Sequence, residues 1–365
     1  MTSLRLHILN FLLLGLCLSA CVEPLEFELD SEVEYVLIDG VISNSPDERT
    51  IRVSRGSGFD QREFKPVNAR GNIYRDGQFW DILAVQAVGE LYVPFTLKLE
   101  EGRSYEIEIT TSNGDIFRSQ PQIVQPKLRM DSLSFGVERR LAGTTFSGLP
   151  RFEQFVDVFA HVRTPGPAEE RYYRWQVDGT FSFIESAQPQ NPNNLPSTCY
   201  LSHYVSENPT TVLGSAGLAE GDVKKLVNSR IADESFLFRH VINVYMHAID
   251  KSTFEYYDRA IRLTQSAGTL FDEVPAPVQG NVKKTEGEPE IVLGQIDFSL
   301  VDTMRISLSK GILKVPISNV CETPTPCPTR PPAPGGVIEP IYCKCWDCDL
   351  ALPNASLFPP FFWDE

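Results

Sequence analysis

Cysteines are the residues of this chain whose spacing most directly suggests chemistry. Cys343, Cys345 and Cys348 lie close together near the C-terminal end. A zinc site built on them needs a fourth thiolate or imidazole at tetrahedral spacing, which Cys321 or Cys327 could supply. Disulfides are the alternative, because they would pin a Pro-rich segment that has no apolar core of its own. The choice depends on the compartment in which the protein folds.

The start of the chain has the organisation of an export signal. Arg5 precedes an apolar run that ends at Leu18, and this run is too short to span a bilayer, which takes about 20 apolar residues. The run ends in small residues before a cysteine, and the tetrapeptide Leu18-Ser19-Ala20-Cys21 resembles the lipobox of bacterial lipoproteins. The resemblance implies that residues 1–20 are a signal peptide and that Cys21 is lipidated. The alternative is an ordinary signal peptide with a cysteine there by chance.

Acyl chains on Cys21 would hold the protein on a membrane, because each buried methylene contributes about 0.8 kcal/mol. The following segment, Val22–Asp30, is acidic and contains no lysine or arginine. It resembles the acidic export signal of surface lipoproteins of the Bacteroidota. This resemblance implies an outer-membrane location, lipid-anchored and facing the cell exterior. A solvated acidic tether over residues 21–33 is the other interpretation, and the two are compatible.

Export favours disulfides over zinc, since disulfides persist in oxidising compartments. Cys17 leaves with the signal peptide and Cys21 is the lipidation site. We expect three disulfides among the remaining cysteines, at least one of them tying segment 343–348 to an earlier position, and no metal site. The disulfide candidates are Cys199, Cys321, Cys327, Cys343, Cys345 and Cys348. The sequence does not choose among the pairings.

Composition limits the class of partner. The chain has 365 residues and a formal net charge of −15, and loss of residues 1–20 removes one arginine and no acid. Nucleic-acid binders need a basic surface, so no nucleic-acid partner is expected. Charge alone also disfavours anionic lipid surfaces. At about 150 residues per domain, the length predicts two domains.

Residues 34–127 show the pattern of a small β domain. From Gly102 to Ile109 the chain alternates strictly, with Tyr105 and Ile107 on the inward face. Asp76-Gly77 is a strong signal for a two-residue hairpin turn. Short strands at regular spacing predict an immunoglobulin-like β-sandwich.

Residues 128–365 are expected to form a larger β-rich domain with one or two helices and a Cys-rich tail. A capping box over Ser252–Glu255 predicts a helix that Gly268 stops. A second, short helix is expected over Leu218–Val227. The pattern from His240 to Ile249 predicts a long strand.

The sequence contains no motif that carries catalysis. It has no Gly-x-Ser-x-Gly elbow and no phosphate-binding loop. His240 and His247 lie at an odd spacing on one expected strand and so face opposite sides of it. Trp80 and Trp175 lie at alternating positions of expected strands, which favours core packing over sugar stacking. We therefore expect no catalytic residues and no cofactor.

Several segments in a fixed order resemble one protein family. They are Tyr35–Ile42, Gly102–Ile107, Asn113-Gly114, Phe254–Tyr257, Gly268–Asp272, Gly280-Asn281-Val282, Val292-Leu293-Gly294, Cys343–Cys348 and Phe362-Trp363. Together they resemble a family of Bacteroidota outer-membrane lipoproteins described as a domain of unknown function. Its members are often encoded beside TonB-dependent receptors, which implies a β-barrel receptor as partner. The family supplies no catalytic residues.

The resulting expectation is a non-enzymatic surface lipoprotein that serves a TonB-dependent transporter as an accessory or ligand-capturing subunit. A structural subunit of an outer-membrane assembly is the second hypothesis, and a surface hydrolase is the third.

Overall fold

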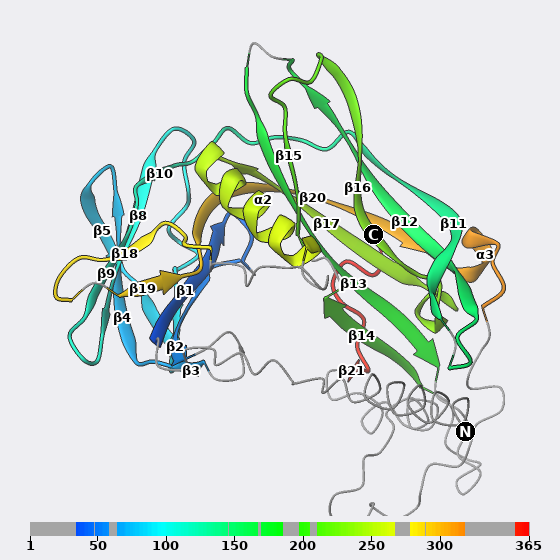
Figure 1. Ribbon diagram of the computed structural model, residues 1–365, viewed down its shortest axis with the longest axis horizontal. Coiled ribbons are helices and arrows are strands. Elements are labelled where there is room, and N and C mark those ends of the chain that lie inside the picture. Colours follow the sequence, from blue (N-terminus) through cyan, green and yellow to red (C-terminus); the bar gives the residue numbers. More distant parts are fainter. Residues whose placement is uncertain are drawn as a thin grey trace, which may run out of the picture.

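The structure is a computed structural model that describes residues 34–46, 48–57, 64–144, 146–166, 169–184, 197–204, 210–266, 278–288, 290–317 and 355–364. Over these residues the chain is mainly β, as the sequence predicts, and its strands form three sheets. Figure 1 shows a smaller group of strands at the left and a larger group at the right, with one helix lying between them.

The smaller group is a β-sandwich, because two sheets enclose one apolar core. That core contains Ile38 and Leu91 from one sheet and Ile73, Ile107 and Phe117 from the other. The first sheet contains β1 (Glu34–Ser43), β2 (Thr50–Ser57), β3 (Lys65–Pro66), β6 (Ala84–Ala87), β7 (Glu90–Tyr92) and β19 (Ile291–Leu293). The second contains β4 (Ala69–Arg75), β5 (Gln78–Ile82), β8 (Ser104–Thr111), β9 (Ile116–Ser119), β10 (Gln122–Ile123) and β18 (Val282–Lys284). The immunoglobulin-like assignment stays a prediction.

Local sequence signals explain how this sandwich forms. In β8, Tyr105 and Ile107 are buried while Glu106 is only half-buried, as the alternation predicts. Asp76 and Gly77 have φ of 52° and 75° and connect the antiparallel strands β4 and β5. Positive φ at both central residues suits the right-handed twist of a hairpin, and the predicted turn is confirmed.

The larger group packs a long sheet against a three-stranded sheet. The long sheet runs in the order β21 (Ala355–Ser356), β14 (Thr198–Tyr204), β13 (Tyr172–Ile184), β17 (His240–Ile249) and β20 (Ile296–Leu308), and β15 (Thr210–Gly214) also pairs with β13. The other sheet is β11 (Ser132–Thr144), β12 (Pro150–Thr164) and β16 (Gly221–Ile231). Between them Tyr173 stacks on the fully buried Trp175 at 5.6 Å, so the expected core role of Trp175 is confirmed.

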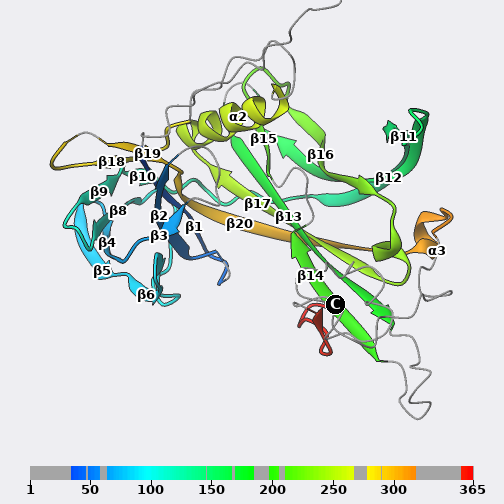
Figure 2. The same cartoon turned by 60° about the horizontal axis from the view of Figure 1, so that its bottom comes forward.

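The two groups share strands. β20 pairs in parallel with β1, so one sheet continues from the larger group into the sandwich (Figure 2). β18 and β19 pair with β9 and β1, and Phe298 of β20 stacks on Tyr105 at 5.6 Å. Residues 282–300 therefore cross the domain boundary that we expected after residue 127. The composition of the sequence does not reveal such pairing between strands that are far apart in the chain.

The helices differ in part from the prediction. α2 (Lys251–Ser266) lies where the capping signal places it, but the capping carboxylate belongs to Asp250, which accepts the Thr253 backbone N–H at 2.8 Å. A short helix, α3 (Lys310–Leu313), and a 3₁₀ turn at Glu234–Phe236 complete the helical residues of the described part. The helix expected over Leu218–Val227 is wrong, because most of that segment is β16, whose backbone pairs with β12.

Candidate functional site

The predicted cysteine sites fall mostly outside the described residues. Cys21, Cys321, Cys327 and the segment 343–348 all lie there. Cys199 lies on β14, opposite Phe183 of β13, and its side chain is fully buried and disulfide-bonded. The pairing scheme and the lipidation of Cys21 stay predictions.

A buried ion pair lies where the sandwich meets the larger group. Arg174 of β13 points its guanidinium at Asp297 of β20, with 3.2 Å between Nη2 and Oδ2, and both side chains are almost fully buried. The Tyr257 ring of α2 lies 5.0 Å from the guanidinium carbon. Burial raises the pKa of Asp297, and the Arg174 charge opposes this rise. The ion pair links β13 to β20, and the contact with the Tyr257 ring adds α2.

A second ionic contact extends this cluster into the sandwich. Glu48, which follows β1, lies 3.2 Å from Nε2 of the buried His247 and accepts a hydrogen bond from the Ser43 hydroxyl at 2.8 Å. His247 Nδ1 is 3.0 Å from the Ser299 hydroxyl. Burial alone raises the pKa of Glu48, but His247, the nearby Arg174 charge and Ser43 together lower it to about 2.

This ionic cluster is an internal joint. Arg174 and His247 are cross-strand partners on β13 and β17, so the paired backbones hold both side chains in place for the two acids. In the described part of the chain no group of three or more His, Cys, Asp or Glu residues could hold a metal ion. These buried pairs hold β13, β17 and β20 against the segment that follows β1. Because the side chains are buried and paired with one another, the cluster leaves no room for a substrate.

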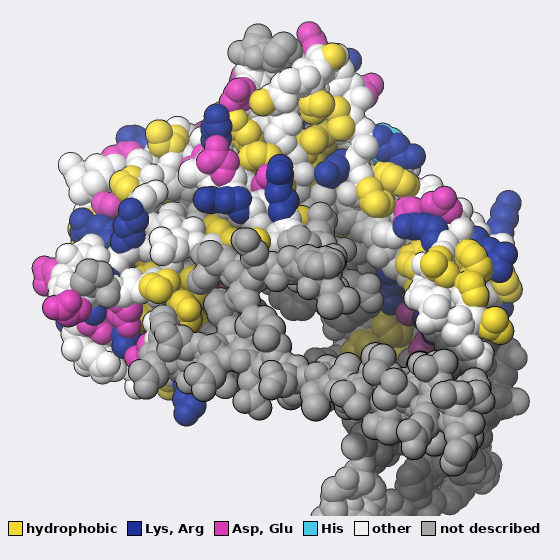
Figure 3. Space-filling model, in the orientation of Figure 1, with side chains coloured by type: hydrophobic (Ala, Val, Ile, Leu, Met, Phe, Trp, Pro, Cys, Tyr) yellow, Lys and Arg dark blue, Asp and Glu magenta, His cyan; other side chains and the backbone are white. Residues whose placement is uncertain are grey.

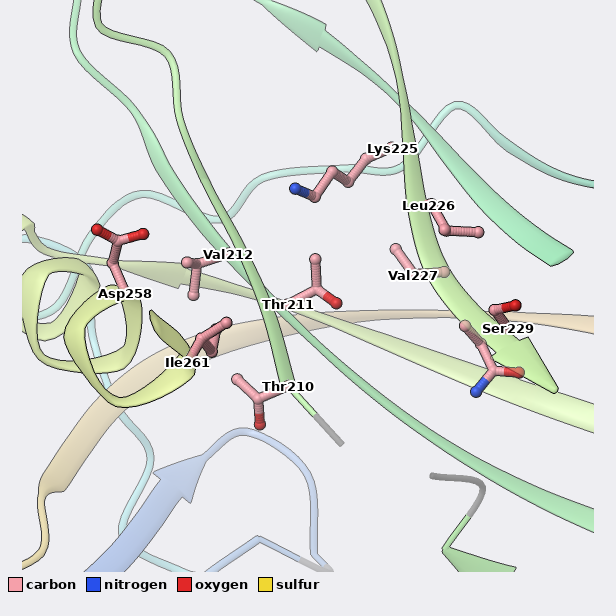
Figure 4. A pocket seen from close by; sticks show the side chains of 10 residues that line it. Thr210, Thr211, Val212, Lys225, Leu226, Val227, Ser229, Asp258 and Ile261 are labelled. Carbon is pink, nitrogen blue, oxygen red and sulfur yellow. The ribbon is translucent and has the colours of Figure 1, made fainter. Parts of the chain in front are cut away.

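An open cleft lies beside α2. Its cavity volume is about 360 Å³, which is within the usual range for a site that takes one small molecule. β15 supplies Thr210, Thr211 and Val212; β16 supplies Lys225 to Ser229; and α2 supplies Asp258 and Ile261. Figure 4 shows the Lys225 side chain extending from β16 toward the α2 side, with hydroxyl groups on the facing strands.

Lys225 is the residue that carries a positive charge in the lining of this cleft. Burial lowers the pKa of the lysine, and the Asp258 charge opposes that shift. Asp258 is already paired with Arg262 at 2.9 Å on the same helix. Among the described residues no carboxylate forms an ion pair with Lys225. A partly desolvated ammonium without a counter-ion favours a ligand that brings a negative charge.

A bulge in β16 shapes the wall of the cleft. Asn228 pairs with Val158 while Leu226 pairs with Phe159, so Val227 is an extra residue in the ladder. A bulge changes the direction of neighbouring side chains, which is why such bulges often border functional sites. Here Val227 and Asn228, although consecutive, are both buried against the cleft.

Sequence reasoning missed both constellations. Among the residues of the ionic cluster and the cleft, only His247 was considered for a functional role. It was considered together with His240, as two histidines that face opposite sides of a strand. Lys225 was assigned to a helix that does not form. Half-buried and exposed residues alternate along the first half of β16, but its apolar and polar residues do not, so the sequence contains no clear strand signal there.

The described residues form a mainly β protein with a small cleft that contains Lys225 and lies between β15, β16 and α2. The chain belongs to the family described as Domain of unknown function (DUF4249), whose model matches residues 22–305. No curated protein matches the chain. In the described residues no helix has the length and apolar character needed to cross a membrane.

Proposed function

We propose that this protein is a non-enzymatic, lipid-anchored lipoprotein of the outer membrane that captures a small acidic ligand for a TonB-dependent transporter. The cleft carries the proposal, because Lys225 is a half-buried cation without a carboxylate partner in a cavity of about 360 Å³. The export signal, the tetrapeptide that ends at Cys21 and the family resemblance support the location and the receptor partner.

The cleft offers the contacts of a binding site. An acidic ligand would pair with Lys225 and accept hydrogen bonds from Thr210, Thr211 or Ser229, while Val212 and Ile261 would cover its carbon atoms. Truncating one partner of a buried, hydrogen-bonded charge pair typically costs about 2–5 kcal/mol, and because Lys225 is only half-buried a smaller loss is expected here. Lys225 is therefore expected to dominate the affinity.

Calorimetric titration of the mature chain with citrate and with galacturonate tests the ligand class. We expect at least one probe to bind, and Lys225→Met to weaken that binding at least tenfold. Lys224→Met is the matched control, because Lys224 is exposed on the opposite face of β16 and its ammonium lies 4.0 Å from the centre of the Phe159 ring. No binding of any probe, or equal effects of the two changes, would contradict the acidic-ligand proposal.

Anchoring is tested separately. Cys21→Ala should abolish labelling with a fatty acid and release the protein from membranes, because the acyl chains provide its hold. Protease treatment of intact cells should degrade the anchored protein. An unlabelled wild-type protein would refute lipidation, and full protection from protease would refute the outward orientation alone.

Affinity purification from solubilised outer membranes tests the partner. A ligand-capturing subunit should co-purify in a fixed ratio with one β-barrel receptor. A structural subunit would co-purify with several proteins in a way that no nutrient changes. Turnover of a substrate by the purified protein alone would contradict the non-enzymatic proposal and favour the hydrolase.

A further inference from the structure

The end of the β11–β12 hairpin projects beyond the sheet that carries it. β11 and β12 pair as far as Thr144 and Pro150, but β16 pairs with β12 only from Phe155 onward. Residues 139–144 and 146–153, here called the hairpin end, therefore extend past the third strand. Figure 2 shows the end of this hairpin standing clear of the rest of the molecule at the upper right.

The hairpin end exposes four large apolar side chains. The exposed fraction is 112% for Phe146, 64% for Leu149, 59% for Leu141 and 50% for Phe152. Leu141 and Phe152 are direct cross-strand partners, so they lie side by side on one face. Figure 3 shows hydrophobic and basic side chains gathered over this end, at the right of the view. A soluble surface rarely keeps such a cluster unless it contacts a partner.

Charges follow this apolar cluster in a defined order along the hairpin. Arg151 is the first charged residue from the turn on β12, and Arg140 is the first on β11. The first acid on β12 is Glu153, three residues from Pro150, or about 10 Å at about 3.3 Å per residue. Arg140 and Arg151 have acidic neighbours, at 3.4 Å from Glu138 and 3.5 Å from Glu153.

Arg139 adds a cation without an acid beside it. Its guanidinium carbon lies 5.0 Å from the centre of the Phe152 ring. Among the described residues it forms no ion pair with a carboxylate. Its positive charge therefore stays available next to the apolar face.

We infer that the hairpin end inserts into an anionic lipid surface. About 10 Å of the hairpin nearest the turn carries apolar side chains and Arg151 but no acid. Arg140 follows level with Glu153, and Arg139 lies one residue pair beyond it. Apolar side chains at the tip with arginines behind them match the order of acyl chains and phosphates across a membrane interface. The acid-free depth of about 10 Å corresponds to the depth at which amphipathic elements sit in the headgroup region.

Two features of the hairpin end favour lipid over a protein partner. Four apolar side chains are far fewer than the roughly 20–30 residues that each side of a stable protein interface contributes. They also project from a narrow ribbon and form no flat or concave face. The net charge of −15 opposes binding only within a Debye length, about 8 Å at physiological ionic strength, so acids further along the protein are screened.

Vesicle flotation tests this inference with the mature chain carrying Cys21→Ser, so that no acyl chain contributes. We expect binding to vesicles of equal parts phosphatidylglycerol and phosphatidylcholine, and at least tenfold weaker binding to phosphatidylcholine alone. Phe146→Ser combined with Leu149→Ser should lower the binding at least tenfold. Arg139→Gln combined with Arg151→Gln should lower it several-fold and reduce its salt dependence.

Phe79→Ser is the matched control, because Phe79 is 58% exposed on β5 of the sandwich. It should leave vesicle binding unchanged, and unchanged urea midpoints should show that all variants fold. Absence of wild-type binding to the anionic vesicles overturns the inference, as does an equal loss from Phe79→Ser. Loss of a co-purifying membrane protein from the hairpin variant, without vesicle binding by the wild type, would assign this surface to a protein partner instead. These outcomes are independent of ligand binding in the cleft.

Discussion

Replacing Asp297 by asparagine removes one charge of the buried ion pair while keeping the shape of the side chain. Arg174 then stays buried with no carboxylate at 3.2 Å. Breaking a buried pair by removing one partner typically costs about 3–5 kcal/mol, because the remaining charge has lost both water and its partner. The Tyr257 ring and the Glu48 charge still stabilise Arg174. We therefore expect a loss near the lower limit, about 3 kcal/mol in the free energy of unfolding.

Urea unfolding at neutral pH measures this loss. Asp222→Asn is the matched control, because its pair with Arg163 is 3.6 Å long and about three-quarters exposed at both side chains. Such a surface pair contributes about 0–1 kcal/mol, so the control should hardly change the midpoint. Arg174→Met added to Asp297→Asn should recover a large part of the loss, since it removes the uncompensated charge.

The reasoning fails on either of two results. One is that Asp297→Asn costs no more than Asp222→Asn, which would mean that the pair is solvated in solution. The other is that the effects of Arg174→Met and Asp297→Asn simply add, which would mean that the two charges do not interact.

Three further predictions concern stability and cross-linking. Because the pKa of Glu48 is lowered to about 2 in the folded protein from an ordinary 4.5, its contribution is complete above pH 4.5 and is lost as the pH falls toward 2. The urea midpoint should fall over that range, and Glu48→Gln should flatten the fall. Gly294→Ala should destabilise the protein by at least about 2 kcal/mol more than Gly287→Ala, although both have φ of +90°. Only at Gly294 would the new Cβ meet a backbone atom, the Ile38 carbonyl oxygen at 2.3 Å. Equal losses would show that φ strain alone matters. Thiol counting on the unfolded, unreduced mature chain should find Cys199 and the other candidate cysteines blocked, and stoichiometric zinc with free thiols would refute the disulfides.

Local signals were sufficient for much of the secondary structure. The alternation around Ile107, the Asp76-Gly77 turn and the helix 251–266 all follow from side-chain period and turn chemistry, which act over a few residues. The same kind of signal failed at Leu218–Val227. There the intrinsic preference was weak, and backbone pairing with β12 decided the outcome.

The candidate cleft was not predictable from local pattern. Its walls come from β15, β16 and α2, and the bulge that buries both Val227 and Asn228 exists only in the ladder with β12. Lys225 became distinctive through its surroundings, because burial and the lack of an acid partner are properties of the assembled walls.

By itself the sequence determined the β-rich class and the sandwich-forming alternation, because each is written in neighbouring residues. The export signal stays a prediction from the sequence. Only the tertiary structure decided that β17 lies between β13 and β20, which brings Asp297 to Arg174, and that His247 meets Glu48. The reason is that side-chain period specifies which face of a strand is buried, whereas the choice of neighbouring strand depends on the packing of whole sheets, and that choice determines which charges meet.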